Sequence, residues 1–274
     1  MLQASGTPIK MSEINVELGR ASDAEITLKK AEDGDYGTIN QSGSHNGSAP
    51  HTMGEWYSYF HYPLIEEAGI IDFWDARALA DSSNWTSIYG DGTNMSVNNG
   101  VTYNSSAPSN FAFDGTNDYM ATDDTITLGT RWTIAIWLKH TADQGADYDR
   151  IVGMTSYQLE VAEDTTGKVR IYDGNWSTVN AIDLDDGNFE HLVITYDDGR
   201  AIGEEMQIYH KNSLDSTTGD GRTVTSKTIY LGSRRAPVGE HWEGQIAQFI
   251  LWGQALTSSQ INALLLNDKD YFDT

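Results

Sequence analysis

Two clusters of carboxylates have the spacing closest to a catalytic acid–base pair. They lie at residues 160–164 (EVAED) and 183–186 (DLDD). Retaining glycoside hydrolysis holds its acid and its nucleophile about 5–5.5 Å apart, which residues two or four apart on one strand face can approach. The glutamates of the first cluster are three apart, and the second cluster directly precedes a turn at Gly187 without a third carboxylate on the same face. We therefore interpret both clusters as solvated turn carboxylates.

Histidines offer a second route to proton transfer. His191 lies beside Glu190, and an imidazole with a carboxylate neighbour is a common proton shuttle. Adjacent residues of a strand point to opposite faces, so a structural role is favoured for this pair. The other histidines show no zinc-binding spacing, and neither a phosphate-binding glycine loop nor a nucleophile elbow is present. The sequence thus predicts no catalytic residue.

Aspartate-rich loops are the candidate metal sites. Hard cations such as calcium prefer several oxygen ligands, and the best candidates are Asp118, Asp123, Asp124 and Asp147. None of these loops reproduces the EF-hand spacing, and an acidic chain contains such clusters by chance. Calcium is the one cofactor that the sequence suggests.

Aromatic residues in loops are the candidate sugar-binding groups. Trp176 and Tyr148 could stack on the apolar face of a sugar ring, while Asn175, Arg234 and Arg235 could hydrogen-bond its hydroxyl groups. Aromatic loop residues also serve protein interfaces, so a glycan and a protein ligand both stay open.

Composition excludes several functional classes. Of 274 residues, 40 are acidic and 17 are Lys or Arg, which gives a formal net charge of −23; nucleic-acid binding needs clustered cations instead. Hydrophobic residues make up 39% of the chain, enough for a folded core. Without cysteine there is no disulfide framework. No run of about 20 apolar residues is present, and residues 1–10 lack the apolar segment of a secretion signal, so we expect no membrane insertion.

Period-two patterning predicts strands over most of the chain. In residues 132–139 the side chains Trp132, Ile134, Ile136 and Leu138 share one face. Similar segments follow at 191–197, 206–210, 228–231 and 245–252, separated by Gly and Asp turns. We predict an all-β fold, a two-sheet antiparallel sandwich.

A short C-terminal helix follows the last predicted strand. Residues 257–260 (TSSQ) form a capping box, and Ile261, Leu264 and Leu265 give one apolar stripe. We expect this helix to plug the edge or the end of the sandwich.

The first 66 residues differ in character from the rest. Ser12 is predicted to N-cap a short helix that ends at Gly19, and residues 52–55 (TMGE) form another capping box. Helices this short are marginal in water alone, so the segment must pack on something else. We predict an N-terminal adaptor at 1–66 and a sandwich domain at 67–274.

The motifs of the second part, in their order, resemble a known domain. Segments 71–77 (IDFWDAR), 111–119 (FAFDGTNDY), 190–197 (EHLVITYD) and 242–252 (WEGQIAQFILW) resemble the LamG-like jelly-roll of the concanavalin A-like lectin/glucanase superfamily. The resemblance covers about 200 residues, a size that such a domain commonly fills. It implies a jelly-roll that usually binds carbohydrate or protein and only sometimes catalyses. The enzymatic branch carries a Glu-x-Asp-x-Glu strand, which neither carboxylate cluster reproduces.

The first part resembles a different module. Segments 11–19 (MSEINVELG), 24–28 (AEITL) and 51–60 (HTMGEWYSYF) are similar to a short N-terminal module of tailed-bacteriophage virion proteins. This resemblance implies that residues 1–66 bind other virion proteins. The sandwich would then be displayed, as a homo-oligomer, in a tail fibre, a baseplate appendage or a capsid decoration.

Three functions follow from these observations. The first is a non-enzymatic bacteriophage virion structural protein, made in the host cytoplasm, whose jelly-roll adheres to a host surface glycan or protein. The second is a free calcium-dependent carbohydrate-binding lectin. The third is a divergent glycoside hydrolase that uses Glu160 or Asp183.

Overall fold

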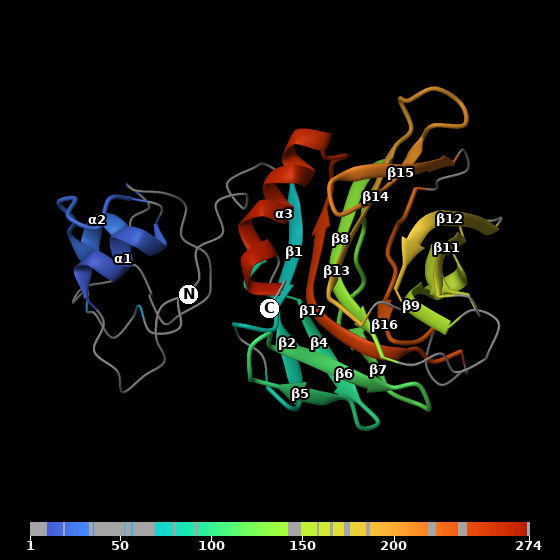
Figure 1. The fold of residues 1–274 in the computed structure, drawn as a ribbon, viewed down its shortest axis with the longest axis horizontal. Helices are drawn as coiled ribbons and strands as arrows, with labels where there is room; N and C mark the ends of the chain where they lie inside the picture. The colour runs from blue at the N-terminus through green and yellow to red at the C-terminus, as the bar shows by residue number, and fades with distance from the viewer. Residues whose placement is uncertain are drawn as a thin grey trace.

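The computed structural model describes residues 10–18, 20–32, 35, 52, 56, 69–78, 81–90, 93–141, 149–157, 159–164, 167–172, 176–184, 187–218, 223–234 and 240–272. In these residues two antiparallel sheets form a sandwich, and α-helices occur only toward the two ends of the chain (Figure 1). None of the helices so described is long and apolar enough to cross a membrane. The predicted all-β sandwich is confirmed.

The first sheet contains nine strands among the described residues. Its main path, in spatial order, is β15 (Ser213–Thr218), β14 (Met206–His210), β13 (Glu190–Asp197), β8 (Arg131–His140), β17 (Glu243–Trp252), β1 (Ile70–Asp75) and β3 (Tyr89–Gly90). β6 (Asn110–Asp114) also pairs with β17, and β5 (Thr102–Asn104) pairs with β6. The long strand β17 therefore has β8 on one side and β1 and β6 on the other.

The second sheet contains eight strands within the described ranges. Their spatial order is β12 (Trp176–Asp183), β11 (Lys168–Tyr172), β10 (Glu160–Glu163), β9 (Asp149–Met154), β16 (Ile229–Leu231), β7 (Tyr119–Thr122), β4 (Asn94–Asn98) and β2 (Asn84–Thr86). A short 3₁₀ turn, η3 (Thr155–Tyr157), follows β9.

The core lies between the two sheets, as the alternation in β8 predicts. Trp132, Ile134, Ile136 and Leu138 are all buried in the main hydrophobic cluster. Ala135 and Trp137, which alternate with these residues, are also buried, but in clusters on the opposite face of the sheet. This part of the sheet is therefore covered on both faces.

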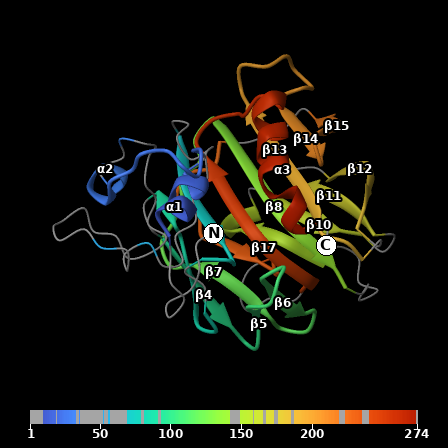
Figure 2. The same cartoon turned by 60° about the vertical axis from the view of Figure 1, so that its left-hand side comes forward.

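Helix α3 (Ser258–Phe272) supplies the cover on the outer face. Its capping box is confirmed, because the backbone N–H of Thr257 donates to Gln260 Oε1 at 2.7 Å. Ile261 and Leu264 bury against apolar side chains of β1, β8, β13 and β17. Figure 1 and Figure 2 both show α3 against this sheet. The expectation that the helix plugs an edge or an end was wrong, because the outer face carries large apolar residues that must be covered.

A buried ion-pair cluster fixes α3 to the sheet. The Arg77 guanidinium pairs with Asp75, and its Nη2 lies 2.7 Å from Asp268 Oδ1 on α3. Gln248 Nε2 on β17 donates to both carboxylates, at 2.9 Å and 3.0 Å. Burial alone would lower the pKa of Arg77, but the two carboxylates raise it above its ordinary value. The guanidinium also lies over the Tyr271 ring, 4.9 Å from its centroid.

The N-terminal segment has a hydrophobic cluster of its own. Helices α1 (Met11–Glu17) and α2 (Leu28–Glu32) contribute to it, and its fully buried members are Ile14, Ala31 and Trp56. The short helices thus pack within their own segment, and this cluster shares no residue with the sandwich clusters.

The start of α1 differs from the sequence prediction. The helix begins at Met11 with Lys10 as its N-cap, whose backbone N–H donates to Glu13 Oε2 at 2.7 Å. The predicted N-cap at Ser12 was wrong, because Glu13 completes the cap from inside the first turn. Gly19, and all of segment 52–55 except its first residue, lie outside the described residues.

Removal of the Arg77 side chain tests the cluster under α3. Arg77→Ala leaves two buried carboxylates without their cation, so we expect the free energy of unfolding to fall by about 3–5 kcal/mol in urea denaturation. Arg131→Ala is the matched control, since the Arg131 side chain is 60% exposed in its pair with Asp197 and should cost about 1 kcal/mol or less. Equal losses in the two variants would contradict this account of α3.

Candidate functional site

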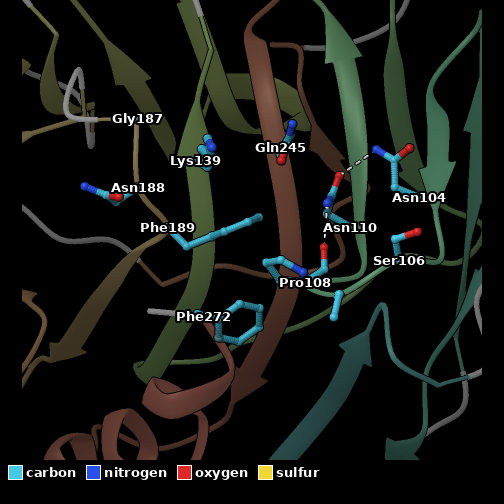
Figure 3. A pocket seen from close by; sticks show the side chains of 11 residues that line it. Asn104, Ser106, Pro108, Asn110, Lys139, Gly187, Asn188, Phe189, Gln245 and Phe272 are labelled. Carbon is cyan, nitrogen blue, oxygen red and sulfur yellow. Dashed lines mark hydrogen bonds between the residues drawn. The ribbon is translucent and has the colours of Figure 1, made fainter. Parts of the chain in front are cut away.

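A polar pocket of about 350 Å³ lies on the outer face of the nine-stranded sheet, beside the end of α3 (Figure 3). Four strands, the loop between β5 and β6, the segment before β13 and α3 supply its lining. The lining residues are Asn104, Ser106, Ala107, Pro108, Asn110, Lys139, Gly187, Asn188, Phe189, Gln245 and Phe272.

Strand pairing places two pairs of polar side chains in the pocket. Lys139 of β8 is the register partner of Gln245 of β17, and Asn104 of β5 is the register partner of Asn110 of β6. Partners in an antiparallel ladder point to the same face, and Figure 3 shows these side chains on neighbouring strands. Asn104 Nδ2 donates to Asn110 Oδ1 at 3.0 Å.

The rim of the pocket is held by α3. The loop between β5 and β6 carries Pro108, whose carbonyl accepts from Asn110 Nδ2 at 2.7 Å. The next residue, Ser109, donates its backbone N–H to the Tyr271 hydroxyl of α3 at 2.8 Å. The position of the loop therefore depends on the docking of the helix.

Aromatic rings form the apolar wall. Phe189 and Phe272 are buried, with ring centroids 5.4 Å apart. Phe272 stacks on Trp137 at 4.5 Å, and Trp137 stacks in turn on His191 at 4.9 Å. This stack connects the wall of the pocket to the interior under α3.

The described lining of the pocket is rich in side-chain amides. Side-chain amides both donate and accept hydrogen bonds, which matches the hydroxyl groups of a sugar. The 11 lining residues include no carboxylate and no histidine, and Lys139 is their one titratable side chain.

The pair Glu190 and His191 has the structural role favoured by the sequence. His191 is buried against Trp137, and burial lowers the pKa of His191 to about 3 because the imidazolium would lose its solvation. Glu190 instead pairs with His210 and with Lys211, whose Nζ lies 3.1 Å from Glu190 Oε1. The two side chains thus contact different partners: His191 stacks on Trp137, and Glu190 pairs with His210 and Lys211.

The first carboxylate cluster is not solvated, which corrects the sequence interpretation. Glu160 and Glu163 are buried on β10. The Nε atoms of Arg150 and Arg234 each lie 2.9 Å from a Glu160 oxygen, and Glu163 accepts from the Trp242 indole at 2.8 Å. These partners stabilise the carboxylates inside the protein. In the second cluster, the Asp183 side chain and residues 185–186 lie outside the described part of the chain.

The sequence-predicted sugar-binding residues do not meet at the pocket where the structure describes them. Arg234 follows β16 of the other sheet, and its guanidinium contacts Glu160 and Glu240. Trp176 begins β12, but its side chain is outside the described part. Tyr148, Asn175 and Arg235 also lie outside the described residues.

The sequence-predicted calcium ligands are spread over separate local contacts. Asp118 is buried, its Oδ2 accepts from the Asp114 N–H at 3.1 Å, and burial raises the pKa of Asp118. Asp123 accepts a hydrogen bond from the Ser96 hydroxyl, and Asp124 is exposed. Among the described residues no three His, Asp or Glu side chains gather into a metal-binding group. Asp147 lies outside them, and calcium binding stays a prediction.

The pocket residues were missed because their sequence signal is weak. Lys139 and Gln245 are polar residues at outward positions near the ends of otherwise apolar strands. That change of polarity along one strand face was the available signal. It shows where the apolar cover ends, but not which other strands contribute to the site.

The fold is that of a lectin-like domain. Residues 114–262, more than half of the 274-residue chain, match the concanavalin A-like lectin/glucanases superfamily. The chain belongs to this superfamily. No curated protein matches it.

Solved structures show the same fold at low identity. The Trypanosoma rangeli sialidase in complex with sialic acid superposes with a TM-score of 0.58 at 17% identity, covering 76% of this chain and 34% of that chain. The binding domain of botulinum neurotoxin DC in complex with rat synaptotagmin II gives a TM-score of 0.56 at 14% identity, covering 73% of this chain and 51% of that chain. This chain thus corresponds to one third to one half of these proteins.

The buried imidazole of His191 predicts a pH dependence of stability. Its folded-state pKa of about 3 lies below the ordinary 6.5, so below pH 6.5 the unfolded chain takes up a proton that the folded protein cannot. This contribution to stability is present above pH 6.5 and is lost as the pH falls toward 3, by about 1.4 kcal/mol per pH unit.

Comparison with His191→Phe isolates this effect, because phenylalanine keeps a ring against Trp137 and carboxylates elsewhere titrate alike in both proteins. Between pH 7 and pH 4.5 the native protein should lose about 2–3 kcal/mol more than the variant in urea unfolding. Parallel losses would show that His191 does not titrate on unfolding.

Proposed function

We propose that this chain is a non-enzymatic bacteriophage virion protein whose jelly-roll binds a glycan on the host surface. The observation that carries the proposal is the polar pocket, where amide side chains from several strands converge beside an apolar wall and the described lining includes no carboxylate. Protein pockets of this size bind small ligands through a few placed polar groups. The sandwich would present this pocket outward from the particle.

A binding role is supported by the state of the carboxylates elsewhere. Glu160 lies between two arginines, and Glu163 accepts from the Trp242 indole. Neither offers a free acid at the pocket. The superfamily fold occurs in a sialidase solved with sialic acid and in a neurotoxin binding domain solved with a protein. A host surface protein is therefore the other ligand class to test.

An attachment role for residues 1–66 is supported by the virion-module resemblance and by the separate cluster around Ile14 and Trp56. Val16 on α1 is 60% exposed in this segment. Because the N-terminal segment has a hydrophobic cluster of its own, an apolar side chain exposed on its surface is available for contact with a neighbouring virion protein. Assembly in a fibre, baseplate appendage or capsid decoration would bring several copies together.

Glycan binding through the pocket can be measured on an array of bacterial surface oligosaccharides. Gln245→Ala removes one amide from the lining, and loss of about 1 kcal/mol of hydrogen bonding should weaken binding about fivefold. Gln207→Ala on β14 is the matched control, because this amide lies outside the pocket. Equal affinities of the two variants would contradict the assignment of the pocket.

The same array with EDTA distinguishes the pocket from a calcium site. Binding through the described lining residues, which include no carboxylate, should be unchanged by the chelator. Loss of binding in EDTA would instead place the ligand at the aspartate loops that contain Asp118, Asp123, Asp124 and Asp147.

Incorporation into particles tests the attachment role. Val16→Asp places a charge on the exposed face of α1 without disturbing the buried cluster, so we expect about tenfold fewer copies per purified particle by quantitative mass spectrometry. The control is Ile202→Asp, at a residue 96% exposed in a loop of the sandwich, which should leave the copy number unchanged. Normal incorporation of Val16→Asp would count against this surface.

A further inference from the structure

We infer that the pocket selects a sugar that carries a negative charge, as a carboxylate or a sulfate. This inference rests on the proposed glycan binding and adds the class of sugar. Among the lining residues that the structure describes, Lys139 is the one titratable side chain, and no Asp or Glu accompanies it. These described residues together carry a positive charge.

This local charge contrasts with the rest of the protein. The chain has 40 acidic residues and a formal net charge of −23, so its overall field repels anions. Several cations of the sandwich are neutralised by carboxylates, including Arg77, Arg150 and Lys211. Within the described part of the chain, no carboxylate pairs with the ammonium of Lys139. A ligand can supply the missing negative charge.

The surroundings of Lys139 strengthen such a contact. The side chain is half-buried, and a charge in a partly desolvated site is screened less than one on an open surface. Its register partner Gln245 makes no hydrogen bond to the described residues through its amide. An anionic group on Lys139 would form charge-assisted hydrogen bonds, while the amides of Gln245 and Asn104 could bind neighbouring hydroxyl groups.

Two carboxylates limit where the negative group of the ligand can sit. Glu243 of β17 and Asp114 of β6 are register partners two positions along the strands from Gln245, and neither lines the pocket. Their charge disfavours an anion at that end. The negative group is therefore directed to the side of Lys139.

The test uses the full-length protein and pairs of oligosaccharides that differ only in charge. The panel contains sialylated and uronic-acid glycans with their methyl esters, and sulfated glycans with their desulfated forms. We expect an acidic member to bind at least about tenfold more tightly than its neutral partner, the effect of one charge-assisted hydrogen bond. The pair that shows this ratio identifies carboxylate or sulfate as the recognised group.

Variants assign the preference to Lys139. Lys139→Gln should remove the ratio by weakening the acidic member to the affinity of its neutral partner, and Lys139→Arg should keep the ratio. Lys227→Gln is the matched control, because Lys227 lies beside β16 in the other sheet and carries the same charge. Circular dichroism confirms that each variant is folded.

The outcomes are distinct. Equal binding of charged and neutral members, or a ratio that survives in Lys139→Gln, overturns this inference and leaves glycan binding in place. Absence of binding to every member of the panel overturns both the inference and the proposed function.

Discussion

The structure depends on covering the outer face of its nine-stranded sheet. Strands β1, β8, β13 and β17 are apolar on both faces, so the second sheet can bury only one of them. Helix α3 buries the other, and the Arg77 guanidinium joins it to the sheet through Asp75 and Asp268. Because these charged groups are buried, loss of one partner would leave the others uncompensated. The apolar stripe and the ion pairs together give the helix one position.

The pocket lies beside the end of α3, where the helix no longer covers the outer face of the sheet. α3 stops at Phe272, and beyond it the outward residues change from Trp137 to Lys139 along β8. Tyr271 then holds the rim loop through Ser109. The helix that completes the hydrophobic cover therefore also forms one wall of the candidate site and positions its rim. Fold stability and site geometry depend on the same contacts.

Charge is distributed differently in the two sheets. Glu160 is neutralised by Arg150 and Arg234 in the eight-stranded sheet, whereas the described lining of the pocket on the other sheet has a lysine and no carboxylate. From sequence, Glu160 was interpreted as solvated, since acidic residues are mostly exposed. The interpretation was wrong because the burial of Glu160 depends on Arg150 of the neighbouring strand β9 and on Arg234, which is 74 residues away in the chain.

The main strands, the buried face of β8, the capping box at Thr257 and the superfamily could be predicted from the sequence, because each is encoded by local spacing or by ordered motifs. The docking position of α3 and the grouping of the polar residues depend on long-range packing and could not be predicted. Asn104, Lys139 and Gln245 are far apart in the chain and become neighbours through strand pairing across β5, β6, β17 and β8. Local sequence patterns specify the sheet face to which a side chain points. Long-range strand pairing determines which side chains lie next to it, and the binding site depends on that pairing.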